Sequence, residues 1–146
     1  MKAVLLFVLL ATTATFSGAT LTNCGTANMT AVFNATSLSV NPAVPARGLW
    51  TFTSVGVSTA KLTNVQAFIT SALCIAGNCI PVDQRTIACS NPTGCNFAAG
   101  PVTILMQQTI PSITPSGNYD VNIAYLASMP SGQVQTFACV DYKFAL

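Results

Sequence analysis

Two closely spaced cysteine pairs are the residues with the clearest capacity for chemistry. Cys89 and Cys95 flank SNPTG, and Cys74 and Cys79 flank IAGN. Such pairs can hold zinc, carry a redox disulfide, or staple a turn. The sequence has no His, and neither pair has the C-x-x-C spacing of a redox motif. We therefore expect structural disulfides and no bound metal.

The groups that usually perform acid–base catalysis are scarce. Without His, no imidazole can act as a general base near neutral pH. The three acids, Asp83, Asp120 and Asp141, fall in separate segments and form no evident carboxylate pair. We predict that the protein is not an enzyme and uses no cofactor.

The first nineteen residues, MKAVLLFVLLATTATFSGA, have the pattern of a secretory signal peptide. A Lys precedes an apolar stretch, and small residues follow it. We expect cleavage after Ala19, with cuts after Ala14 or Gly18 as alternatives, so that residues 20–146 form one domain. Secretion would place the cysteines in an oxidising compartment.

Six cysteines lie downstream of this segment, and an even number in a secreted chain indicates three disulfides. Fifteen pairings are formally open. Proximity across turn residues favours Cys74–Cys79 and Cys89–Cys95, which leaves Cys24–Cys139. In the chain-entropy model each short bridge contributes about 2 kcal/mol and the long one about 5 kcal/mol.

The chain carries unusually little charge: 5% of residues are charged and 51% are hydrophobic. Without clustered Lys and Arg, we expect no nucleic-acid partner. Sequons at Asn28 and Asn34 predict glycosylation, which would keep a neutral surface soluble, whereas Pro92 bars the third triplet at Asn91.

The elements that must position these residues are β-strands. Short runs rich in Thr, Val, Ile, Phe and Tyr alternate with Pro, Gly, Asn and Ser turns, and helical periodicity is nearly absent. This pattern predicts an all-β, antiparallel sandwich. The expected strands cover residues 30–40, 50–57, 62–71, 85–89, 102–110, 119–126 and 134–144.

Several expected strands have one apolar face. Tyr119, Val121, Ile123 and Tyr125 share one parity, and Val102, Ile104 and Met106 share another. These faces should turn inward together. Periodicity alone leaves open whether the interior between them is a filled core or a cavity for an apolar ligand.

Five short motifs, in this order, resemble the ML lipid-recognition family across almost the whole expected domain. They are Asn23-Cys24-Gly25; Val40-Asn41-Pro42 with Pro45 and Gly48; Cys89 to Cys95 with Phe97 and Gly100; Pro115-Ser116-Gly117-Asn118-Tyr119-Asp120-Val121; and Phe137-Ala138-Cys139-Val140. The resemblance implies an immunoglobulin-like β-sandwich whose sheets part to admit a sterol or a lipid tail.

By this resemblance the protein is a lipid-binding and lipid-transfer protein that is secreted or resides in the endolysosomal lumen. Its partners would be a sterol or phospholipid and an acceptor membrane or membrane protein, and it would be monomeric. The implied cavity walls are Phe68, Ile69, Phe97, Ile104, Met106, Tyr119, Val121, Ile123 and Tyr125. The alternative is an extracellular interaction module with a filled core and no lipid ligand.

Overall fold

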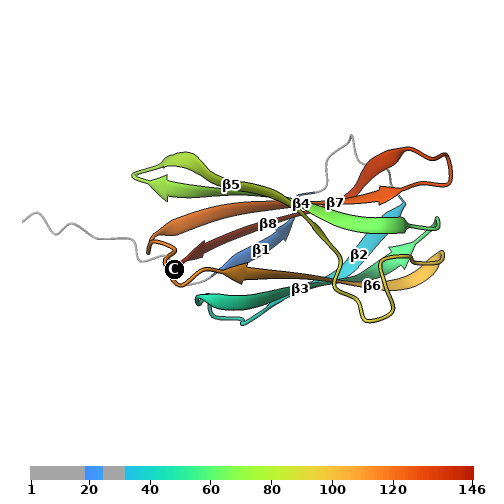
Figure 1. Cartoon of the computed structure of the whole chain (residues 1–146), viewed down its shortest axis with the longest axis horizontal. Helices are drawn as coiled ribbons and strands as arrows, with labels where there is room; N and C mark the ends of the chain where they lie inside the picture. Colours follow the sequence, from blue (N-terminus) through green and yellow to red (C-terminus); the bar gives the residue numbers. More distant parts are fainter. Residues whose placement is uncertain (1–18, 25–31) are drawn as a thin grey trace, which may run out of the picture.

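The computed structural model describes residues 19–24 and 32–146, and it has the predicted all-β architecture. Two antiparallel sheets pack face to face (Figure 1). The strands are β1 (Thr20–Asn23), β2 (Phe33–Asn41), β3 (Gly48–Ser58), β4 (Thr63–Ile75), β5 (Asn78–Ala88), β6 (Gly100–Ile110), β7 (Asn118–Ser128) and β8 (Val134–Ala145). The described ranges contain no helix long and apolar enough to cross a membrane.

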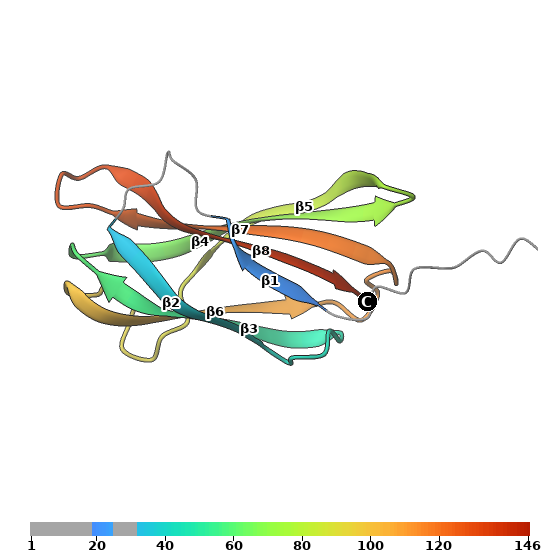
Figure 2. The ribbon, with the colours of Figure 1, turned by 180° about the vertical axis from the view of Figure 1, so that it is seen from behind.

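The two sheets differ in width. One has five strands in the order β1-β8-β7-β4-β5, and the other has three in the order β2-β3-β6. Figure 2 shows from behind how β2, β3 and β6 form the narrower layer. β5 is the last strand of the wider sheet and therefore forms one of its edges. The first residues of β5, 78–82, are all exposed.

The alternation of buried and less buried side chains along each strand determines which residues form the core. Along β7 the side chains of Tyr119, Val121, Ile123 and Tyr125 are buried, while those between them are only half-buried. β6 repeats this pattern and extends it to Gln108. Both predicted apolar faces therefore turn inward, as period-two burial requires.

Two strands differ from the sequence prediction. β1 was not expected, because four residues, TLTN, carry almost no periodic signal; β1 forms by pairing with β8. β5 begins at Asn78 rather than near Arg85. Pro81 interrupts that stretch, and an edge strand tolerates a proline because one side of its backbone has no partner.

All three predicted disulfides are present. Cys24–Cys139 joins the residue after β1 to β8 across 115 positions of sequence. Asn122 on neighbouring β7 donates a hydrogen bond from Nδ2 to Oδ1 of Asp141, at 2.8 Å, beside this disulfide. Cys74–Cys79 staples the tip of the β4–β5 hairpin, where the two residues are register partners.

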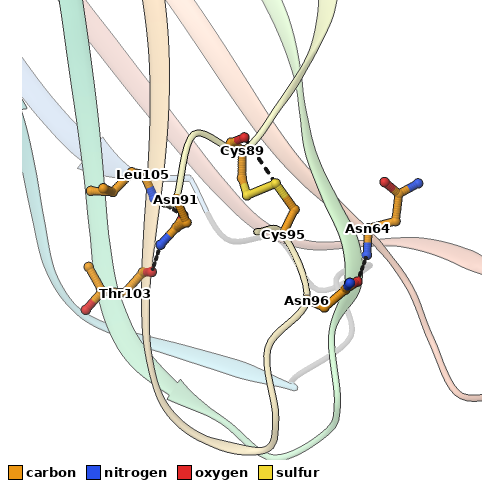
Figure 3. The surroundings of a disulfide bond; sticks show 7 residues. All are labelled: Asn64, Cys89, Asn91, Cys95, Asn96, Thr103 and Leu105. Carbon is orange, nitrogen blue, oxygen red and sulfur yellow. Dashed lines mark hydrogen bonds between the residues drawn. A yellow bond between two sulfur atoms is a disulfide. The ribbon is translucent and has the colours of Figure 1, made fainter. Parts of the chain in front are cut away.

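The Cys89–Cys95 loop joins β5 to β6 and contacts both sheets (Figure 3). Asn91 acts as a strand partner for the free edge of β6: its Nδ2 donates to Thr103 O at 2.7 Å and its Oδ1 accepts from Leu105 N at 2.8 Å. Asn96 Oδ1 accepts from Asn64 N, just inside β4. The stapled loop thus connects the two sheets near one end of the sandwich. We call that end the closed end.

Some sequence predictions fall partly outside the described residues. Residues 1–18 of the expected signal peptide and the sequon residue Asn28 lie there. Asn34 is described: its side chain is exposed on β2, opposite Val57. Its glycosylation remains a prediction.

Candidate functional site

A cavity of about 370 Å³ opens at the end of the sandwich opposite the Cys89–Cys95 loop. This open end carries the β2–β3 loop, the β4–β5 hairpin, the β6–β7 loop and the C-terminus (Figure 1). Strand register places these segments together: Gly48 pairs with Ile110, and Cys74 pairs with Asn118. The volume falls within the range of about 300–1,000 Å³ typical of small-molecule sites.

The cavity walls come from both sheets, from the β6–β7 loop and from the C-terminal residue. They are mostly apolar, and the lining residues are Trp50, Phe52, Ser71, Leu73, Val82, Asp83, Arg85, Gln108, Ile110, Pro111, Ile113, Thr114, Pro115, Tyr119, Val121, Phe144 and Leu146.

Aromatic side chains form the rigid part of the wall. Trp50 of β3 meets Phe144 of β8 edge-on, with ring centroids 4.7 Å apart. Phe144 stacks on Tyr119 at 5.4 Å. Because these rings are fixed by contacts across the two sheets, they give the cavity a preformed apolar surface.

Hydrogen bonds hold the β6–β7 loop over the cavity. Tyr119 Oη donates to Pro115 O at 2.8 Å. Arg47, from the β2–β3 loop, donates from Nε and Nη2 to Thr114 O at 3.0 and 2.7 Å. Leu146 and Gly117 exchange backbone hydrogen bonds, which fix the C-terminus against the loop. The lip of the cavity is therefore ordered.

The cavity lining contains two charged side chains, which pair with each other. Arg85 Nε donates to Asp83 Oδ2 at 2.6 Å, and both side chains remain more than one third exposed. An exposed pair of this kind contributes little to stability. The pair places both charged groups of the lining on the edge strand β5, while most of the other lining residues are apolar.

The structure gathers two of the nine sequence-predicted wall residues, Tyr119 and Val121, at this cavity. Five others lie in the filled core between the cavity and the closed end; they are Ile69, Ile104, Met106, Ile123 and Tyr125. Phe68 is half-buried and has the opposite parity to Ile69 on β4. Phe97 bridges to Leu62 at the closed end.

Most of the lining residues were not singled out by the sequence analysis. Gln108 could have been, because it continues the inward parity of Val102, Ile104 and Met106 along β6. A polar residue at an inward position is an informative signal. The β6–β7 loop carries no periodic signal that would indicate a wall.

The three acids do not form a catalytic pair of free carboxylates in the described part of the chain. Asp83 pairs with Arg85, Asp120 with Lys143, and Asp141 with Asn122. Asp141 also lies within 4.8 Å of the Cys24 and Cys139 sulfurs. Those sulfurs are joined in a disulfide, so they offer no thiolate to a metal.

Two tyrosines of the core, Tyr125 and Tyr142, have a raised pKa. Burial raises the pKa of Tyr125, and a 3.0 Å hydrogen bond donated by Ser54 partly offsets the rise. Burial also raises the pKa of Tyr142, whose hydroxyl has no hydrogen-bond partner among the described residues. Both phenols stay protonated in the folded protein at a pH where they ionise in the unfolded chain. Stability is therefore unaffected below the usual pKa of about 10 and falls as pH rises above it.

We expect Tyr142→Phe to raise the free energy of unfolding by about 1 kcal/mol, because it removes a buried hydroxyl that makes no hydrogen bond. Tyr125→Phe serves as the matched comparison and should lower it by about 1 kcal/mol, since Ser54 loses its acceptor. Urea unfolding at neutral pH measures both effects. When the measurement is repeated above pH 10, the free energy of unfolding should fall less in each variant than in wild type. Equal effects of the two substitutions at neutral pH would contradict this assignment.

Comparison with known proteins identifies the family. The ML domain family model matches residues 18–146. The chain belongs to the ML domain family. No curated protein sequence gives a significant match. Thirteen chains of solved structures match, among them a Niemann-Pick type C2 protein from the Japanese carpenter ant, with a TM-score of 0.59 at 11% identity.

That alignment covers 86% of this chain and 98% of the ant protein. At such low identity the likeness shows a shared fold. Together with the family match, it confirms the predicted resemblance and the β-sandwich fold of this ML domain.

Proposed function

We propose that this ML domain binds a sterol or a phospholipid tail between its sheets and transfers it to a membrane. The observation that carries the proposal is the mostly apolar cavity of about 370 Å³ at the open end. Moving an apolar ligand from water into such walls gains about 25 cal/mol per Å². No catalytic group is required for this function.

Equilibrium binding tests the proposal directly. Purified protein is titrated with a fluorescent sterol and, separately, with a fluorescent phospholipid, and unlabelled lipid is added in competition. Saturable, competable binding of one probe supports the proposal. If neither probe binds, the lipid-carrier function is lost, and an extracellular interaction module becomes the better interpretation.

Transfer requires a route from the membrane to the cavity, and the open end offers an apolar surface. Exposed large hydrophobic side chains lie on its loops, on the β4–β5 hairpin and at the start of β3: they are Val44, Leu49, Ile75, Ile80, Val82 and Ile113. Val82 and Ile113 also line the cavity, so this surface is continuous with the cavity walls. We infer that the open end contacts a lipid bilayer.

Ile75 and Ile80 test this contact because they flank the Cys74–Cys79 staple and do not line the cavity. We expect Ile75→Asp with Ile80→Asp to slow transfer of labelled lipid between phosphatidylcholine vesicles by about tenfold, because charged residues oppose insertion at the membrane interface. Affinity for monomeric lipid should stay within about twofold of wild type.

The matched control is Val57→Asp with Val134→Asp, which places two charges on exposed apolar residues near the closed end. This control should transfer lipid like wild type. Equal slowing by both double variants would show that added charge, rather than the open end, governs transfer.

We also propose that the protein is secreted or reaches the endolysosomal lumen, and that it acts as a monomer. Three disulfides support this location, because they persist in oxidising compartments. N-terminal sequencing of protein recovered from the medium of expressing cells tests it, with Thr20 as the expected first residue. An intact Met1 would contradict it.

A further inference from the structure

One buried polar side chain on the cavity wall lacks a hydrogen-bond partner. Gln108 of β6 is only 8% exposed, lines the cavity and is the register partner of Trp50. Within the described ranges its amide makes no hydrogen bond. Two buried serines have partners: Ser54 donates to Tyr125 Oη, and Ser58 donates to Ala60 O.

Gln108 faces the open cavity, and a ligand that fills the cavity would displace water from its amide. An amide that loses water and gains no other partner is unfavourable. A Leu or Met at position 108 would continue the apolar parity of Val102, Ile104 and Met106 without this penalty. An unpaired amide at this position is therefore favourable only if the ligand in the cavity supplies a hydrogen-bond partner.

We propose that Gln108 hydrogen-bonds a neutral oxygen of the bound lipid, either a hydroxyl or an ester carbonyl. A side-chain amide matches both, because its NH₂ donates to either oxygen and its C=O accepts from a hydroxyl. Gln108 is thus the residue that selects oxygen-bearing lipids over pure hydrocarbon. This inference rests on the proposed lipid-binding function.

The distribution of charge favours a neutral oxygen over an ionised headgroup. The charged lining residues, Asp83 and Arg85, lie on the edge strand β5, remain more than one third exposed and pair with each other. Gln108 sits on the opposite sheet in a mostly apolar wall, where an ionised group would lose its hydration without a counter-ion. A charged headgroup would remain at the lip.

Matched lipid pairs test the inference in two arms. The sterol arm compares cholesterol with 5-cholestene, which lacks the 3-hydroxyl. The phospholipid arm compares ester-linked with ether-linked phosphatidylcholine, which lacks the acyl carbonyls. In the arm that binds, wild type should prefer the oxygen-bearing lipid by about tenfold, since the analogue leaves the amide unpaired.

Gln108→Leu should reduce this preference to about twofold or less while hydrocarbon binding is kept or improved. Gln107→Leu is the matched control: it makes the same change one residue away, on the outer face, where Gln107 donates to Thr51 Oγ1 at 3.3 Å. It should retain the tenfold preference.

The outcomes separate the two claims. If the protein binds neither the sterols nor the phospholipids, the proposed function itself is contradicted. Binding without preference in wild type, or a preference that survives in Gln108→Leu, overturns the role of Gln108 and leaves lipid binding intact. If Gln108→Leu does not fold, Gln108→Met replaces it, and a preference that survives in Gln108→Met overturns the role of Gln108 in the same way.

Discussion

Replacing Val121 with Trp is expected to abolish lipid binding while the fold is kept. Val121 projects from β7 into the cavity and is 6% exposed. The larger side chain would occupy space that the ligand needs, so we expect affinity for the lipid probe to fall at least about fiftyfold. Overpacking usually costs about 1–3 kcal/mol, and the empty volume beside Val121 should keep the cost at the lower end.

The matched control is Val57→Trp, which makes the same change on the outer face of β3, where Val57 is 46% exposed. Probe titration and thermal unfolding should be measured on both variants. Tight binding by folded Val121→Trp would place the ligand elsewhere than in this cavity.

Loss of the Cys24–Cys139 disulfide is expected to have the largest effect on stability. The bridge closes a loop of more than one hundred residues, so replacing both cysteines with Ala should lower the free energy of unfolding by about 4–5 kcal/mol in the chain-entropy model. Without the bridge, four-residue β1 would depend on its backbone pairing with β8 and on the packing of Leu21 against the core. Thermal or urea unfolding under non-reducing conditions measures the change.

The Cys74–Cys79 double Ala variant is the comparison, because it removes a disulfide that spans only five positions. We expect a loss of about 2 kcal/mol there. Lipid affinity should be unaffected, because neither cysteine lines the cavity. Losses of equal size in the two variants would mean that loop length does not control the contribution of these bridges.

The sandwich and its disulfides could be predicted because they depend on local signals. Alternation along β6 and β7 is regular, so it assigned the inward side chains correctly. Turn residues between Cys74 and Cys79 and between Cys89 and Cys95 indicated short-range pairing. β1 could not be predicted because a strand of four residues shows no clear periodicity.

The position of the cavity could not be predicted in the same way. Parity states which face a side chain occupies, but it does not give the distance between the sheets along the strands. Tyr119 and Ile123 share a face of β7, yet Tyr119 lines the cavity and Ile123 is fully buried in the filled core. The separation depends on long-range features: the closed end is fastened by the stapled loop, and β5 extends past the narrower sheet.

Native mass spectrometry of the full chain, purified under mild conditions and then incubated with cholesterol or phosphatidylcholine, tests the central claim most directly. We expect one bound lipid per protein molecule, lost on denaturation and absent from Val121→Trp. A spectrum that shows only ligand-free wild-type protein after both incubations would contradict the claim that the two sheets enclose a lipid.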